Sequence, residues 1–363
     1  MKNLKTQGFV LLDTDVAALN NSGKDAQSNY DNAVATKKIT KGRSTHVYVS
    51  GQAWRYWWRQ TLQKDHEWAM SPVERTKDVA FTEANPLKYA DDDVFGYMRA
   101  TKDADLDEAG EVKLDKKGKP VLVDATVTRV SPLKNSALIS VSSVQTAHSW
   151  SVMARMDGNP VPYVKEEYGT VLKGMFSIDL QQVGTFATYN RTGFKNLTVG
   201  LQNQALKDGG ELVPDEGMRN PKGEPQQLVR LPRPTRLQRV QDTLRALKTI
   251  TGGAMQTNNY TDVTPKFIVL ATLQSGNHPF GHIVRSGGLF GGEVTFDREA
   301  LAEALRDYAD QLTGTVFIGR RRGFMEEEFA DLAEWATAFP NVRLGSVVEA
   351  IEGYCTELEQ WMP

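Results

Sequence analysis

The spacing of apolar positions changes several times along the chain, and each spacing predicts a different element. Residues 8–20, "GFVLLDTDVAALN", and residues 265–273, "PKFIVLATL", carry apolar runs rich in β-branched residues, which are typical of strands. Strand texture recurs at 136–144, 175–189 and 314–322. Apolar residues recur at helical spacing in 235–250, 297–312 and 325–339. We therefore predict one α+β domain spanning residues 1–363, with insertions.

A short strand at 45–50, "THVYVS", precedes a predicted helix at 51–63 that has two unlike faces. At 3.6 residues per turn, one face carries Ala53, Trp54, Trp57, Trp58 and Thr61. The opposite face carries Gln52, Arg55, Arg59 and Gln63, with Tyr56 beside them. Tryptophans at core spacing favour a packed core over a platform for stacking bases. The two arginines have no carboxylate at a neighbouring helical position, so they either face a ligand or are simply solvated.

Ser50 favours the ligand, because it lies where the N-cap of this helix belongs. A helix N-terminus exposes unpaired N–H groups and a partial positive charge, which suit a phosphate group. Ser50, Gln52, Arg55 and Arg59 therefore predict a phosphate-binding strip where the strand meets the helix. Such contacts hold a nucleic-acid backbone in position but do not read its sequence.

A second candidate element follows the basic helix at 235–250. Gly252 and Gly253 would by themselves indicate only a helix C-cap. Gln256, Asn258 and Asn259 then offer neutral hydrogen bonds to a sugar, a phosphate or a base. This loop is a weaker signal than the strip.

Charge is segregated along the chain, although the formal net charge is only −2. Seven Lys or Arg and no Asp or Glu lie in residues 32–64, and eight lie in 218–248 beside Glu224 and Asp242. Each run alone is compatible with a solvated face, including the arginines of the second helix, Arg236, Arg239 and Arg245. Two basic segments in a net-acidic protein favour a groove for a polyanion.

Several blocks resemble a known family: "YVSGQAWRYWWRQTL", "TRVSPLKNSALIS", "GMFSIDLQQVGTF" and "ITGGAMQTNNYTDVTPKFIVLA". In this order they resemble the backbone subunit of type I CRISPR Cascade complexes, specifically its DevR-like type I-B branch. The resemblance covers most of the chain. The block "SGQAWRYW" is its most specific part.

The resemblance implies an RRM-like (ferredoxin-like) palm with inserted fingers and a thumb β-hairpin. Residues 71–124, which include a predicted hairpin with a Lys-Gly turn, would form the fingers, and residues 155–174 the thumb. Residues 205–234 are expected to be a long flexible loop, because Gly and Pro punctuate them.

The resemblance also implies the function, a non-catalytic subunit that multiplies along the CRISPR guide RNA as a helical filament. Its partners would be guide RNA, target DNA, neighbouring copies of itself and other Cascade subunits, with base pairing supplying specificity. The implied RNA-binding residues are the strip and the glycine loop, with Lys38 and Lys41 of the first basic segment.

Candidate chemistry is sparse, and we expect neither an enzyme nor a cofactor or metal. His278 and His282 have a metal-like spacing, but no third ligand is evident. Cys355 is expected to be a buried thiol. Asp91, Asp92 and Asp93 could hold Mg²⁺ for RNA cleavage, as in type III relatives, but a solvated turn is the favoured interpretation.

Two alternatives to the non-catalytic subunit therefore remain, namely an RNA-cleaving backbone subunit and a DNA-binding transcriptional repressor. The repressor is disfavoured because no helix-turn-helix pattern is evident. One cysteine, no signal-peptide pattern and no membrane-spanning apolar run predict a cytoplasmic protein without membrane contact.

Overall fold

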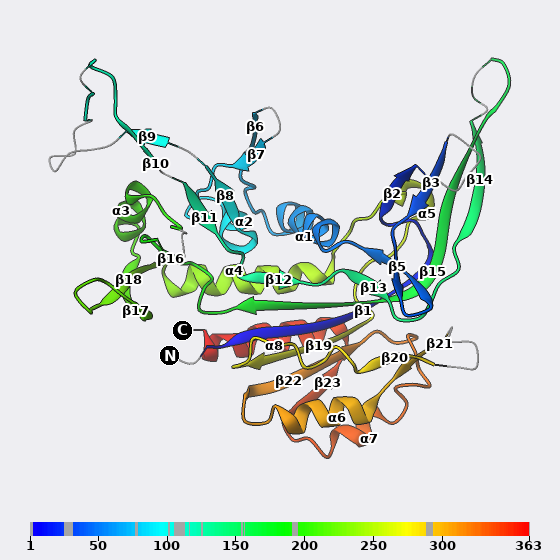
Figure 1. The fold of residues 1–363 in the computed structure, drawn as a ribbon. Coiled ribbons are helices and arrows are strands. Elements are labelled where there is room, and N and C mark those ends of the chain that lie inside the picture. Colours follow the sequence, from blue (N-terminus) through cyan, green and yellow to red (C-terminus); the bar gives the residue numbers. More distant parts are fainter. Residues whose placement is uncertain are drawn as a thin grey trace. The chain divides into compact units, whose positions relative to one another are not determined.

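The computed structural model (Figure 1) describes most of the chain. The described residues are 3–24, 32–76, 79–100, 102–104, 113–115, 117–124, 126–153, 155, 157–190, 195–287 and 293–362. Parts of the predicted fingers (77–78, 101, 105–112 and 116) and residue 156 of the predicted thumb lie outside this set.

The chain divides into two compact units. The first comprises Met1–His66, Lys134–Ile178 and Gln241–Trp361, and the second comprises Glu67–Leu133, Asp179–Val240 and the last two residues. Three elements begin in one unit and end in the other: β12 (Leu133–Asn135), β15 (Val161–Asp179) and α4 (Arg233–Arg245).

The first unit is built on a large sheet. Besides β12 and β15, this sheet contains β1 (Lys5–Ala17), β2 (Asn21–Lys24), β3 (Ala33–Thr36), β4 (Lys38–Lys41), β5 (Ser44–Val49), β13 (Leu138–Ser140), β14 (Ala147–Met153), β19 (Phe267–Leu273), β22 (Leu312–Arg320) and β23 (Val342–Gly345). Strands β20 (Val284–Gly287) and β21 (Glu293–Phe296) form a separate two-stranded sheet. Its helices are α1 (Gly51–Asp65), η1 (Ala246–Lys248), α5 (Gln256–Asn259), α6 (Arg298–Asp307), α7 (Leu332–Ala336) and α8 (Val347–Trp361).

This sheet is mixed. Within the described residues it has 12 strands, and its main path runs β23-β22-β19-β1-β15-β13-β5-β4. Strand β1 pairs with β19 antiparallel, whereas β22 pairs with β23, and β15 with β3, in parallel. The predicted α+β class is confirmed. The assignment of palm, fingers and thumb stays a prediction.

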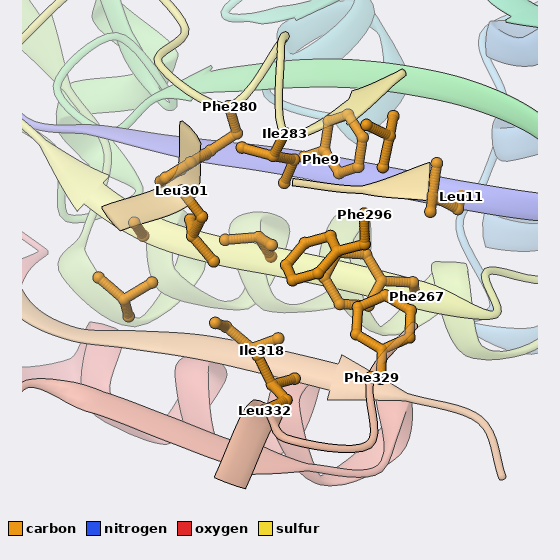
Figure 2. Close-up of a cluster of buried hydrophobic side chains, with 14 of the residues drawn as sticks. Phe9, Leu11, Phe267, Phe280, Ile283, Phe296, Leu301, Ile318, Phe329 and Leu332 are labelled. Carbon is orange, nitrogen blue, oxygen red and sulfur yellow. The ribbon is translucent and has the colours of Figure 1, made fainter. Parts of the chain in front are cut away.

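One face of the sheet holds an aromatic core (Figure 2). Phe9 of β1 packs edge-on against Phe267 of β19, and the Phe267 ring stacks on Phe329 with centroids 4.9 Å apart. Leu301 of α6 and Leu332 of α7 belong to the same cluster. Odd-numbered residues of β1 and β19 thus face this core.

Even-numbered residues of these strands face helices on the other side. Tyr354 of α8 donates to Thr6 Oγ1 at 2.8 Å, and its hydroxyl also lies 2.8 Å from Thr272 Oγ1. The ring of Phe176 crosses β1 at Gly8, where a Cβ atom would lie 2.1 Å from it. Because both faces are covered, the central strands read as continuous apolar runs.

The second unit consists of short hairpins and helices. Its elements are β6 (Val73–Thr76), β7 (Val79–Thr82), α2 (Ala90–Phe95), β8 (Tyr97–Arg99), β9 (Lys102–Ala104), β10 (Leu122–Asp124), β11 (Val127–Arg129), β16 (Thr185–Ala187), α3 (Val199–Lys207), β17 (Glu211–Arg219) and β18 (Pro225–Arg230). A small core packs β16 and β18 against α3 through Phe186, Val229 and Ala205.

The expectation of a long loop at 205–234 is wrong. Strands β17 and β18 pair as an antiparallel hairpin within it. Gly223 takes a positive φ in the turn, and Asn220 Oδ1 accepts hydrogen bonds from the N–H groups of Lys222 and Glu224. The Gly and Pro residues therefore mark a tight turn and strand ends.

The helix expected at 325–339 is also mostly wrong, since only α7 forms there. Met325 has a left-handed backbone conformation, and the Glu326 carboxylate accepts from Gly323 N and pairs with Arg320. These contacts hold the preceding residues in turns, while Phe329 still enters the core.

Candidate nucleic-acid interface

Helix α1 begins where the sequence predicts. Ser50 has an extended backbone conformation, and its Oγ accepts a hydrogen bond from Ala53 N at 3.3 Å. Ser50 N donates to Asn20 Oδ1 at 2.8 Å, so a neighbouring loop holds the cap in place. The predicted N-cap is confirmed.

The tryptophan face of α1 is core, as predicted. Trp54 and Trp58 stack with their ring centroids 5.4 Å apart, and Trp58 packs edge-on against Phe176. Trp58 Nε1 also donates to Thr243 O at 2.7 Å. The rings are therefore not available for stacking on bases, and they fix the rotation of α1 about its axis.

The opposite face presents two guanidinium groups, both partly buried. Arg55 Nη1 donates to Asn135 Oδ1 at 3.0 Å. Burial, together with the like charge of Arg59, lowers the pKa of Arg55 to about 10. The structure thus holds two cations close enough to repel each other on one face of α1, the helix that Ser50 caps. An anion bound between them would relieve that repulsion.

Asn135 of β12 was missed by the sequence reasoning. Its Nδ2 donates to Gly51 O at 3.2 Å and to Ser136 O at 3.0 Å, while its Oδ1 accepts from Arg55. One amide therefore joins the first turn of α1 to the side chain of Arg55. The stretch "LKNSALIS" contains it, but nothing local relates it to residues 80 positions earlier.

The structure brings the glycine loop against α1. A Cβ atom on Gly252 would lie 2.2 Å from Trp57 Cγ, and one on Gly253 would lie 2.4 Å from Leu19 Cδ2. Both glycines also have positive φ angles. They are not the cap of the preceding helix, which ends before them, but allow close approach of the backbone to Trp57 at Gly252 and to Leu19 at Gly253.

The amides of this loop have different surroundings. Gln256 Nε2 donates within the loop, to Gly252 O and Thr261 O. Asn259 donates to Glu167 of β15 and accepts from Lys165, so it is tied to the sheet. Asn258 is exposed.

The two predicted lysines of β4 also differ. Lys38 pairs with Glu166 of β15. Burial raises the pKa of that carboxyl, but hydrogen bonds from Lys38 and Thr36 N outweigh it, and the pKa is lowered overall. Lys41 is exposed, and its charge adds to burial in lowering the pKa of Lys173.

The cations of the predicted basic helix at 235–250 do not form a solvated basic face. Arg236 and Arg239 are buried, and Arg245 and Lys248 both pair with Glu352 of α8. These four cations are therefore either buried or paired within the protein. The basic helix at 235–250 was misread because its partners lie far away in the sequence.

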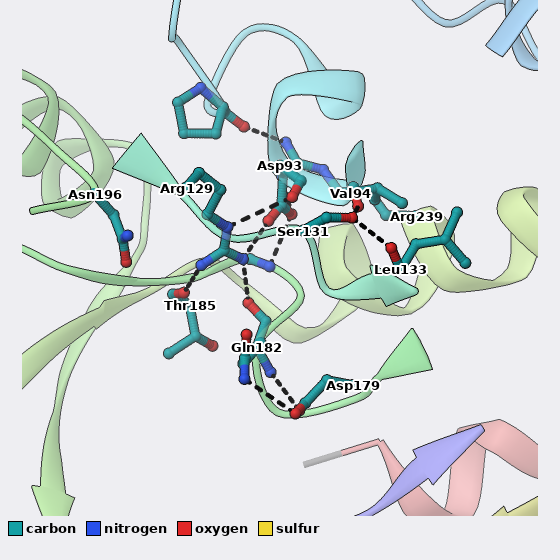
Figure 3. A network of polar contacts seen from close by, with 12 residues as sticks. Asp93, Val94, Arg129, Ser131, Leu133, Asp179, Gln182, Thr185, Asn196 and Arg239 are labelled. Atoms are coloured by element: carbon teal, nitrogen blue, oxygen red, sulfur yellow. Dashed lines mark hydrogen bonds and ion pairs between the residues drawn. The ribbon is translucent and has the colours of Figure 1, made fainter. Parts of the chain in front are cut away.

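The solvated turn expected at Asp91–Asp93 is likewise wrong (Figure 3). All three aspartates are buried on α2. Asp93 accepts from Arg129 at 2.6 Å, from Arg239 at 2.7 Å and from Gly184 N at 2.8 Å. The arginines are 36 and 146 positions away, so no local pattern could reveal them.

The histidine and cysteine candidates, His278 and Cys355, have surroundings typical of residues that contribute to packing. His278 Nε2 lies 2.8 Å from Gly8 O, and burial lowers the pKa of its imidazole to about 4. Cys355 is buried, as predicted, and burial raises the pKa of its thiol to about 12. Among the described residues, no three His, Cys, Asp or Glu side chains are grouped to hold a metal ion. No helix in this part of the chain is long and apolar enough to cross a membrane.

Comparison with solved structures shows a shared fold. A chain of a "CRISPR RNA-guided surveillance complex, pre-nicking" superimposes with a TM-score of 0.50 at 9% identity, covering 97% of this chain and 99% of that one. A chain of a "CRISPR RNA-guided surveillance complex" gives 0.48 at 9% identity, covering 98% and 99%. No curated protein matches the sequence.

A family model shows the kinship directly. The family described as "CRISPR-associated negative auto-regulator DevR/Csa2" matches residues 12–285, which is well over half of the chain. The match includes α1, β15 and the glycine loop. The resemblance seen in the sequence is therefore confirmed, and the chain belongs to the DevR/Csa2 family of CRISPR-associated proteins.

Proposed function

We propose that this protein is a backbone subunit of a type I-B Cascade complex and grips the guide RNA by its sugar–phosphate backbone. The observation that carries the proposal is the pair Arg55 and Arg59 beside the Ser50 cap. Asn135 orients Arg55 at 3.0 Å, and burial and Arg59 lower its pKa to about 10. A phosphate at this helix end meets two guanidinium groups and the partial positive charge of the N-terminus.

The proposed RNA path continues from this strip. Gln52, Lys41 and Asn258 are exposed and can each reach a backbone group of a bound strand. The Gly252–Gly253 backbone lies next to Trp57 of the same helix. Gln256, Asn259 and Lys38 complete the proposed set, although each must exchange an internal contact to bind RNA.

Assembly along the RNA is part of the same proposal. The matched solved chains come from RNA-guided surveillance complexes, and they share this fold. Residues 71–124 would act as fingers, and residues 155–174 as the thumb. Copies joined head to tail with other Cascade subunits then form a filament that presents guide bases to target DNA.

We further infer that the subunit does not cleave nucleic acid. The aspartates that could have held Mg²⁺ are buried and accept hydrogen bonds from the protein's own groups, such as Ser71 N to Asp91 and Asn85 N to Asp92. These hydrogen bonds hold elements of the second unit together. Incubating the assembled complex with complementary RNA and Mg²⁺ or Mn²⁺ tests this inference, and regular cleavage would contradict it.

The grip is tested by the double variant Arg55→Glu/Arg59→Glu. RNA should no longer copurify, while the far-UV circular dichroism stays unchanged because the tryptophan face is untouched. The matched control is Arg306→Glu/Arg343→Glu, which makes the same change of net charge at exposed positions of α6 and β23. If the first variant retains RNA as well as the control does, the strip is only surface.

A further inference from the structure

The exposed side of α1 carries an aromatic residue that the phosphate strip does not use. Tyr56 follows Arg55 directly, and its side chain is 60% exposed. It lines a hollow of about 360 Å³ together with Gln60 and Lys64 of the same helix. Residues 251–254 also line it.

The walls of this hollow are fixed by packing. Trp57, which also lines it, is 4% exposed and meets Gly252 so closely that no Cβ atom would fit between them. Ala254 N donates to Leu19 O at 3.0 Å, which ties the loop to the end of β1. The hollow is therefore pre-formed, and its volume lies within the range of small-ligand sites, roughly 300–1,000 Å³.

The chemistry of the lining suits a nucleobase. It combines an exposed phenol ring, a side-chain amide, a lysine and backbone groups, with no carboxylate among the described lining residues. Other hollows formed by the described residues do include carboxylates, such as Asp13 and Asp15 in one and Glu299 in another. Those would repel a polyanion.

Resting on the proposed function, we propose that this hollow is a stacking subsite for one base of the bound RNA, with Tyr56 as the stacking surface. Arg55 and Tyr56 are adjacent in the sequence and point about 100° apart around α1. A strand whose phosphate sits on Arg55 can therefore turn its base toward Tyr56. Gln60 and Lys64 then meet polar atoms on the edge of that base.

The experiment measures whether the effect of removing Tyr56 depends on the presence of one particular base of the RNA. The full chain is titrated with a short single-stranded RNA in which one abasic nucleotide is moved along the strand. Wild type should lose affinity roughly 5- to 150-fold at one register, the range expected for one base stacked on an aromatic ring. Tyr56→Ala should bind the intact RNA with the same loss and be indifferent to the abasic position, whereas Tyr56→Phe should behave as wild type.

Controls separate this proposal from the proposed function. Val348→Ala, which trims an exposed side chain of α8, should change nothing. If Tyr56→Ala retains full affinity and the same abasic profile, the subsite is refuted while the arginine strip stands. If Tyr56→Ala disturbs only the association of copies, the hollow is a protein contact and the proposal also fails. The proposed function fails instead if Arg55→Gln/Arg59→Gln binds RNA as tightly as wild type does.

Discussion

Two pairs of arginines in this protein differ in the groups that their guanidinium groups contact. In the second unit, Arg129 and Arg239 both donate to one buried carboxylate, Asp93, which is fully enclosed. In the first unit, Arg55 donates to the neutral amide of Asn135, and Arg59 lowers its pKa rather than raising it. Arg129 and Arg239 thus converge on a buried carboxylate, whereas Arg55 and Arg59 repel each other along one face of α1.

The difference teaches how to recognise a site for an anion. Arginine content alone does not distinguish the pairs, because α4 looks more basic in the sequence and yet its Arg236 and Arg239 are buried. What distinguishes them is the group that each guanidinium meets. An amide orients an arginine without neutralising it, so the cation keeps its affinity for a ligand.

The largest expected effect follows from breaking the buried pair. Asp93→Asn leaves two buried guanidinium groups without their carboxylate, and the free energy of unfolding should fall by about 3–5 kcal/mol. Urea denaturation followed by circular dichroism measures it. Asp331→Asn is the control, because Asp331 is 67% exposed beside Arg298 and should cost less than about 1 kcal/mol. Equal losses for the two variants would contradict the account.

The next largest effect is expected from disrupting the contact between Gly252 and Trp57. Gly252→Ala places a methyl group 2.2 Å from Trp57 at a positive φ angle and should cost about 1–3 kcal/mol, as overpacked cores do. Gly200→Ala in α3 would place its Cβ 4.0 Å from Thr198 Oγ1, an ordinary contact distance, and should instead stabilise the protein, by about 0.5–1 kcal/mol. Thermal unfolding of the two variants gives the sign of each change, and destabilisation by both would mean that glycine loss alone explains the result.

The Ser50 N-cap is expected to contribute less to the free energy of unfolding. Ser50→Ala removes the acceptor for Ala53 N and should lower the free energy of unfolding by about 1 kcal/mol. Ser50→Asp keeps an acceptor there and should retain stability, but its negative charge should weaken RNA binding. Stability and RNA affinity are therefore expected to separate between these two variants. A Ser50→Asp protein that binds RNA normally would show that no phosphate approaches the cap.

The smallest expected effect comes from placing a carboxylate beside Arg55. Asn135→Asp gives Arg55 a carboxylate, as Asp93 does for Arg129, but it also removes the Nδ2 donor to Gly51 O and Ser136 O, so thermal unfolding of the variant is measured alongside. The pairing should remove one phosphate contact, so the slope of log affinity against log salt should flatten by about 0.7 for single-stranded RNA. Filter binding across a salt series measures this slope. An unchanged slope would place the RNA elsewhere than on Arg55.

Much of this could be predicted from the sequence because it depends on local periodicity. The strand β1, the two faces of α1 and the Ser50 cap each follow from neighbouring residues, and the family followed from ordered blocks. Asn135, the Asp93 network and the burial of Arg239 could not be predicted, since each depends on a partner far away in the chain. The hairpin at 211–230 was missed because Gly and Pro mark turns and loops alike.

Identifying the nucleic acid bound to the protein tests the proposed function. The nucleic acid that copurifies with the full chain is extracted, treated with ribonuclease or deoxyribonuclease, and sequenced, from wild type and from Arg55→Glu/Arg59→Glu. The account predicts RNA transcribed from a CRISPR array with wild type, and its loss with the variant. Duplex DNA bound equally by both proteins would contradict the account and favour a transcriptional repressor.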